Sequence, residues 1–189
     1  MRVSSISERV QRALEDSDRP HVLSSLLACF QEAHWGASRR PGTWRPTPGS
    51  DLARDVALPS TFADWAASHR DELTAPPASA ETHVHLPCCL ETDTFVLAIE
   101  DATGGPQPTG TASYPARHRL SLVIEAVRAL ADGRLYGVGV VAREGFDEPR
   151  RAAILEGLPH LEREEAEDLY AAYWGWCTPT RLKEALDAR

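Results

Sequence analysis

The side chains with the most chemical potential stand in one short segment, His83-Val84-His85-Leu86-Pro87-Cys88-Cys89. Imidazole nitrogens and thiolate sulfurs are ligands that zinc and other transition metals prefer. The segment alternates as a half-buried strand does, with His83, His85 and Cys89 on one face and apolar side chains on the other. On a straight strand Cys89 would lie about 20 Å from His83, so the segment divides into a histidine pair and a separate cysteine pair.

The histidine pair would bind one metal if a carboxylate joined it. Two histidines at i and i+2 of a strand lie roughly 6–7 Å apart at Cα, which suits chelation. A turn that folds the strand 94–101 back antiparallel would bring Asp101 opposite His83, or Glu100 opposite His85. Two histidines and one carboxylate are the ligands of many iron(II) oxygenases and some zinc sites. One hypothesis is therefore a small metal-dependent enzyme that holds zinc or iron at these four residues.

The common catalytic motifs are missing from the sequence, which has no GxSxG, HExxH or paired CxxC. Gly137, Gly139 and Ala142 have the spacing of a dinucleotide fingerprint. That fingerprint must follow a strand and open a helix, whereas these residues fall inside the predicted strand 135–142. Glycines inside a strand indicate a bulge or the close approach of another element.

A second hypothesis rests on the most aromatic stretch of the chain, which ends a helix predicted to run from about 161 to 174. Exposed tyrosine and tryptophan are the usual energetic centres of protein interfaces. This pattern favours a non-catalytic accessory, adaptor or immunity-type protein that binds another protein. Its candidate partner-binding residues are Tyr170, Tyr173, Trp174 and Trp176.

A third and weaker hypothesis concerns the loop 35–59, which begins with a Pro- and Gly-rich stretch. Arg39, Arg40 and Arg45 lie there beside tryptophan, a mixture that can bind an anion or stack a base. The alternative is that the tryptophans pack back onto the protein with the arginines over them. The loop length favours this alternative, because long structureless loops are uncommon in compact domains.

The composition is that of an acidic globular protein, with net charge −8, 42% hydrophobic and 25% charged residues. The negative charge argues against nucleic acid as the main partner, since that affinity comes from neutralising phosphates. The sequence shows neither the apolar core of a signal peptide nor an apolar run of about 20 residues. We therefore expect a cytoplasmic protein with free thiols and no membrane contact.

The order of the expected helices and strands along the sequence predicts an α+β fold. Helices are expected at 6–16, 21–34 and 60–73, followed by a linker near 74–80. A small, mainly antiparallel sheet over 82–142 would come next, with C-terminal helices packed on it. The helical N-terminal region would span 1–78, and the sheet with the C-terminal helices would span 79–189. We expect the two regions to form one folded unit.

The run 120–131 admits two interpretations. Its apolar residues suit two strands joined by a turn at Asp132-Gly133, or one face of a helix. The polar residues of the run recur at spacings of three and four, which favours the helix.

Overall fold

The computed structural model describes residues 5–15, 22–30, 52–75, 82–104, 111 and 113–187. In these residues helices and strands combine in an α+β fold, as the sequence predicts. The helices are α1 (Ile6–Glu15), α2 (Val22–Cys29), α3 (Thr61–Ser68), the 3-10 turn η1 (Arg70–Glu72), α4 (Arg119–Ala131), α5 (Arg151–Glu156), α6 (Arg163–Tyr170) and α7 (Pro179–Asp187). The strands are β1 (Arg54–Ala57), β2 (His83–Leu86), β3 (Cys89–Glu91), β4 (Phe95–Asp101), β5 (Leu135–Val141) and β6 (Tyr173–Cys177).

The larger sheet has the strand order β3-β4-β5-β6. Strand β3 is antiparallel to β4, whereas β4, β5 and β6 are parallel. Parallel neighbours need a crossover connection, which α4 supplies between β4 and β5, and α5 with α6 between β5 and β6. The sheet is thus mixed, not mainly antiparallel. A separate two-stranded ribbon pairs β1 with β2 and connects the regions on either side of residues 76–81.

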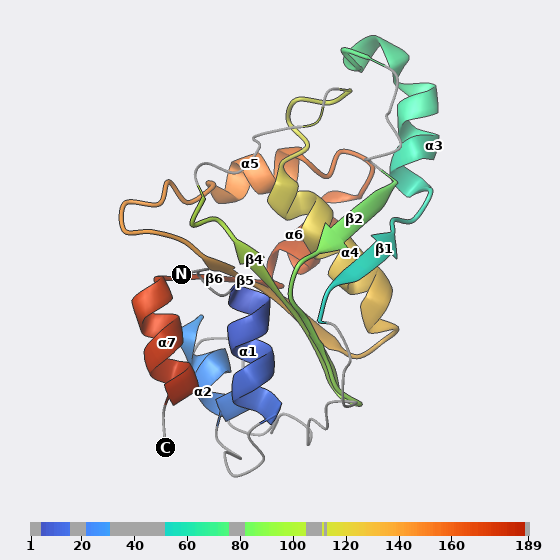
Figure 1. Cartoon of the computed structure of the whole chain (residues 1–189). Coiled ribbons are helices and arrows are strands. Elements are labelled where there is room, and N and C mark those ends of the chain that lie inside the picture. Colours follow the sequence, from blue (N-terminus) through green and yellow to red (C-terminus); the bar gives the residue numbers. More distant parts are fainter. Residues whose placement is uncertain are drawn as a thin grey trace.

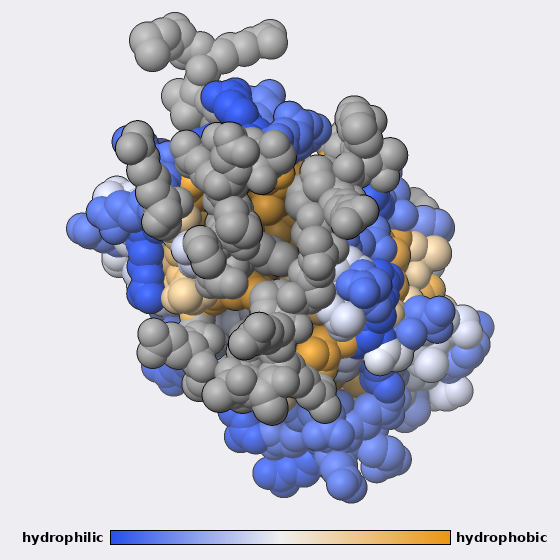
Figure 2. All heavy atoms as spheres, turned by 90° about the horizontal axis from the view of Figure 1, so that it is seen from below, coloured by the Kyte–Doolittle hydropathy of each residue, from blue (hydrophilic) through white to orange (hydrophobic). Residues whose placement is uncertain are grey.

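Helices cover both faces of the larger sheet (Figure 1). The apolar side chains of α4, α5 and α6 form one core cluster with Val96 and Ala98 of β4. Those of α1, α2 and α7 form the other cluster with Phe95 and Leu97 of the same strand. Successive residues of β4 therefore enter opposite cores, which explains why the strand is apolar almost throughout. Figure 2 views the molecule from the side of α1, α2 and α7, where many described hydrophilic side chains lie at the margin.

The helix predicted for 120–131 is confirmed as α4. His118 is its N-cap, and its Nδ1 accepts a hydrogen bond from the Leu120 N–H at 3.1 Å. The helix ends where Asp132 adopts a left-handed conformation with φ 47° and Gly133 follows with φ 80°. Glycine permits that second positive φ without a steric penalty.

The glycines of β5 allow the close approach of other side chains, as predicted. A Cβ at Gly137 would overlap the ring of Trp174. A Cβ at Gly139 would lie 2.5 Å from a ring carbon of Phe30. The register between β5 and β6 also shifts in this region. Both glycines therefore make room for aromatic rings from β6 and from the end of α2.

The N-terminal helix α1 is capped by Ser5 and Glu8. The Ser5 hydroxyl accepts from the Glu8 N–H, and the Glu8 carboxylate accepts from the Ser5 N–H, both at 3.1 Å. This reciprocal pair is a capping box. It allows Ile6 and Val10 to bury their side chains in the core.

The prediction of one helix from 161 to 174 is wrong at its C-terminal end. Helix α6 stops at Tyr170, and residues 173–177 form strand β6. Aromatic side chains favour a pleated, buried surface, and pairing with β5 satisfies the backbone of this segment. A positive φ of 96° at Gly175 also excludes a continuing helix there. Thr178 then caps α7, since its Oγ1 accepts from the Arg181 N–H at 3.2 Å.

Within the residues that the structure describes, no helix combines the length and the apolar character needed to cross a membrane.

Candidate functional site

Helix α3 and the turn η1 project from one corner of the molecule (Figure 1). Ser60 stands at the N-cap position, but its side chain makes no cap; its hydroxyl donates to the Asp64 carboxylate at 3.1 Å. Phe62 and Ala66 are the buried residues of the helix. Most of the other α3 side chains are exposed, so one narrow stripe attaches the helix to the body.

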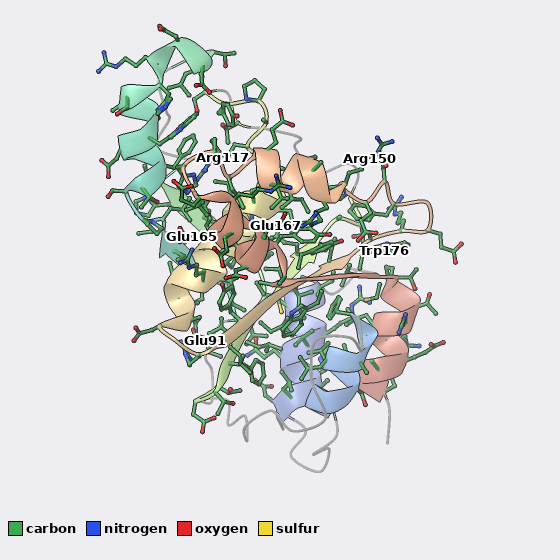
Figure 3. The ribbon with its side chains drawn as sticks, turned by 180° about the vertical axis from the view of Figure 1, so that it is seen from behind. Glu91, Arg117, Arg150, Glu165, Glu167 and Trp176 are labelled. Atoms are coloured by element: carbon green, nitrogen blue, oxygen red, sulfur yellow. The ribbon has the colours of Figure 1, made fainter. Side chains whose placement is uncertain are left out.

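A buried polar cluster holds this stripe in place. The Arg117 guanidinium lies over the Phe62 ring, 3.6 Å from its centre, and donates to the Glu125 carboxylate at 2.8 Å. The other Glu125 oxygen lies 2.7 Å from Nε2 of His160, whose ring meets Phe62 edge-on. The Arg117 side chain is fully buried and those of Glu125 and His160 nearly so. Figure 3 shows Arg117 between α3 and the region of α5.

Aromatic rings continue from this anchor towards solvent. Trp65 stacks on Phe62 with ring centres 5.6 Å apart, and on His69 at 4.8 Å with only 12° between the ring planes. Tyr114 meets Trp65 edge-on at 5.5 Å. Trp65 and Tyr114 are half-buried, and His69 is exposed. The result is a rigid aromatic surface, formed by Trp65, His69 and Tyr114, that rests on the buried Phe62.

Burial is the main cause that raises the pKa of Tyr114, and the carboxylates of Glu156 and Glu72 raise it further. The phenol is therefore protonated at neutral pH and can donate a hydrogen bond to a bound group.

A cavity of about 600 Å³ lies beside the aromatic surface. Its described lining is mostly small and apolar, with one charged side chain, and consists of Ala63, Ala66, Ala67, Arg70, Leu73, Thr74 and Ala75. The last part of this wall is fixed by Thr74, whose backbone N–H donates to the Ser113 carbonyl at 2.8 Å. A volume of this size lies within the range of ligand pockets, so the cavity is large enough to take an apolar side chain of a partner.

Exposed carboxylates surround these features. Asp64, Asp71 and Glu72 are all exposed on α3 and η1, against the single cation Arg70 in the same two elements. The surface therefore combines stacked rings, a cavity with a mostly apolar lining and net negative charge.

The structure separates the four predicted metal ligands. The histidine strand β2 pairs with β1, not with residues 94–101, and β4 instead takes β3 as its antiparallel partner. The chain leaves the first pairing at Pro87. Glu100 is buried and accepts two hydrogen bonds from Arg119, at 3.0 and 3.2 Å. The Asp101 carboxylate accepts from the N–H and hydroxyl of Thr103.

His83 and His85 share the exposed face of β2. Nδ1 of His85 lies 2.9 Å from the carboxylate of Asp55, its direct neighbour across the ribbon, and Nδ1 of His83 lies 3.0 Å from the Thr82 hydroxyl. In the part of the chain that the structure describes, no three His, Cys, Asp or Glu side chains are arranged to hold a metal ion.

The C-terminal aromatic residues divide between the core and its margin. Tyr173 and Trp174 are buried, at 6% and 4% exposure, which removes them from a surface of the free chain. Trp176 is half-buried and meets Phe146 edge-on at 5.7 Å (Figure 3). Tyr170 is also half-buried, with the Arg151 guanidinium 5.7 Å from its ring centre. This segment consequently offers much less aromatic surface than its composition suggests.

The candidate anion-binding residues Arg39, Arg40 and Arg45 lie outside the described residues.

The sequence assigned no function to Phe62, Trp65 and His69, which fall within the helix expected at 60–73. Their spacing of three and four residues was the available signal, and it does not distinguish a packed face from an exposed one. Nothing local to the sequence indicated that Arg117 and His160 would both contact Phe62 beneath that face.

Comparison with protein-family models, curated proteins and solved structures finds no match to this chain.

Proposed function

We propose that this chain is a cytoplasmic, non-catalytic protein-binding module whose docking surface is α3 with η1. The observation that carries the proposal is the stack of Trp65 and His69, which remains at the surface on a helix anchored by a buried charged cluster. Rigid aromatic side chains give large contact areas at little entropic cost, which is why they dominate interface energetics.

The buried anchor supports this role, because an interface element must hold its side chains in place before the partner arrives. Phe62 contacts both the Arg117 guanidinium and the His160 ring, so the rings above it rest on a fixed base. The adjacent cavity gives the same surface a recess for an apolar side chain of the partner.

The charge around the stack favours a basic partner. Asp64, Asp71 and Glu72 would attract lysine or arginine side chains, and a cation over Trp65 would gain a cation–π interaction. The overall charge of −8 points in the same direction.

The test is photo-cross-linking in the native cell, with a photoreactive amino acid at position 69 or, as control, at position 183 on α7. We expect position 69 to give one discrete adduct that position 183 does not give. The protein in that adduct is then purified and titrated against the chain.

Trp65→Ala should weaken the measured affinity about 30-fold, which corresponds to about 2 kcal/mol for a central aromatic residue. The exposed His69→Ala tests the same surface without disturbing the core. Trp176→Ala tests the alternative C-terminal surface. If Trp176→Ala weakens binding while His69→Ala and Trp65→Ala leave it unchanged, the docking surface is not on α3.

A further inference from the structure

The wall that α3 and η1 give to the cavity changes from apolar to charged along its length. Ala63, Ala66 and Ala67 line it from the helix, and Arg70 lines it from η1, four residues after Ala66. Because an alanine side chain ends at Cβ, this side of α3 leaves space that longer side chains would fill. The cavity is therefore apolar along α3 and has a cation at its η1 end.

The rest of the described lining is held in place by hydrogen bonds. It consists of Leu73, Thr74 and Ala75, which follow η1. The Leu73 N–H donates to the Arg70 carbonyl at 3.2 Å and closes the turn. The Thr74 N–H and hydroxyl both donate to the Ser113 carbonyl, at 2.8 and 3.1 Å. A lining fixed in advance lowers the entropic cost of binding a ligand.

Arg70 is placed to recognise an anion. Its side chain is exposed, and among the described residues its guanidinium has no hydrogen-bond or ion-pair partner, although Asp71 and Glu72 follow it directly. A guanidinium binds a carboxylate through two parallel hydrogen bonds. The two neighbouring carboxylates would repel a doubly charged phosphate more strongly than a singly charged carboxylate, so the carboxylate suits this position better.

We propose that the cavity binds the C-terminal residue of the partner protein, with its apolar side chain against the alanines and its carboxylate on Arg70. This inference rests on the proposed docking surface at α3 and adds which part of the partner that surface recognises. A chain terminus carries an apolar side chain and a carboxylate on one residue, whereas an internal Asp or Glu brings a carboxylate alone. Capture of a C-terminal carboxylate is a recurring mode of peptide recognition.

The acidic side chains beside the cavity define the residues that precede this terminus. Asp71 and Glu72 are exposed in the same turn as Arg70, and Asp64 is exposed on α3. Lysine or arginine upstream of the terminal residue would pair with them, while the terminal carboxylate itself needs the one cation. The complementary ligand is thus a basic segment that ends in an apolar residue with a free carboxylate.

The experiment uses the purified full chain and two synthetic peptide libraries that are random at their C-terminal ends. One library ends in a free carboxylate and the other in an amide. The free-acid library should be enriched in peptides that end in leucine, isoleucine, methionine or phenylalanine, with lysine or arginine at the preceding positions. The amide library should show no enrichment. Equal enrichment of both libraries, or enrichment of neither, would overturn the proposal.

Titration of an enriched peptide against variants tests the individual contacts. Arg70→Ala should weaken binding of the free acid about tenfold or more and abolish the difference between the acid and its amide. Ala67→Phe should block binding, because it places a ring in the cavity. Both positions are exposed, so neither change removes a core side chain.

Arg143→Ala is the matched control, since this exposed arginine follows β5 and is not among the lining residues. It should bind the peptide as the wild-type chain does. An equal loss in Arg143→Ala and Arg70→Ala would reveal a general charge effect and refute recognition by Arg70. Octanoate, an apolar carboxylate without a peptide chain, should compete only weakly. Tighter binding of octanoate than of the peptide would assign the cavity to a free small acid instead.

The partner cross-linked at position 69 separates this inference from the docking surface itself. Removal of its last few residues should weaken its affinity about tenfold or more. An unchanged affinity would leave α3 as the docking surface and refute recognition of the terminus alone. The absence of an adduct, together with no enrichment from either library, would refute both.

Discussion

The guanidinium carbon of Arg117 lies 3.6 Å from the centre of the Phe62 ring, in the interior of the protein. This contact joins the projecting helix α3 to the N-terminal side of α4. Arg117 is among the largest fully buried side chains, and its charge is balanced there by Glu125. The attachment of the candidate docking surface thus depends on a buried ion pair.

Glu125→Leu should lower the free energy of unfolding by about 3–5 kcal/mol, because it leaves the Arg117 charge buried opposite an apolar group. The double variant Arg117→Met with Glu125→Leu should recover part of this loss, since it removes both charges. Urea unfolding of the single and double variants measures the difference. A double variant less stable than Glu125→Leu would show that the arginine stabilises the core by packing on Phe62 more than the ion pair does.

Gly137→Ala should destabilise the protein by about 1–3 kcal/mol, because the added methyl group would overlap the ring of Trp174. Gly104→Ala is the matched control, since no atom of the described residues lies within 4 Å of a Cβ built there. Thermal or urea unfolding should separate the two variants clearly. Equal stabilities would mean that Trp174 can move aside without cost.

His118 should make the free energy of unfolding decrease as the pH falls below 6.5. Burial lowers the pKa of this imidazole from its ordinary value of 6.5, and its neutral Nδ1 accepts the Leu120 N–H. The unfolded chain takes up the proton more readily, so the contribution of His118 is present above pH 6.5 and is lost as the pH falls through the lower folded pKa.

His118→Asn should reduce the slope of unfolding free energy against pH below pH 6.5, since asparagine keeps the capping acceptor but does not titrate. The comparison is the wild-type chain. Urea unfolding at several pH values gives both slopes. An unchanged slope in His118→Asn would assign the acid sensitivity to other groups.

Zinc binding at the β1–β2 ribbon should need His83 and His85 but not Glu100. The two imidazoles share an exposed face, whereas the Glu100 carboxylate is held by Arg119. Asp55 holds Nδ1 of His85, so Nε2 is the nitrogen placed for a metal, as in carboxylate–histidine–metal arrangements.

Zinc titration by calorimetry should therefore show weak binding that His83→Ala and His85→Ala abolish and Glu100→Gln preserves. Removal of the metal with a chelator should leave the melting temperature unchanged, because the pair of His85 and Asp55 is exposed, at 61% and 79%. Tight zinc that depends on Glu100 would contradict the separation of these ligands.

Local sequence patterns determined much of the scaffold. The spacing of polar residues identified α4, and the two glycines of β5 correctly indicated close neighbours, because helical and strand periods are properties of a few consecutive residues. The alternation of His83 to Leu86 likewise identified a strand with exposed histidines.

Only the tertiary structure decided how these elements meet. Contacts between distant parts of the chain determine which strand pairs with β2 and whether 173–177 is helix or strand. They also bring Arg117 and His160 to the Glu125 carboxylate. A single sequence carries the period of each element, but the register and the burial of its residues come from packing, in which the whole chain takes part.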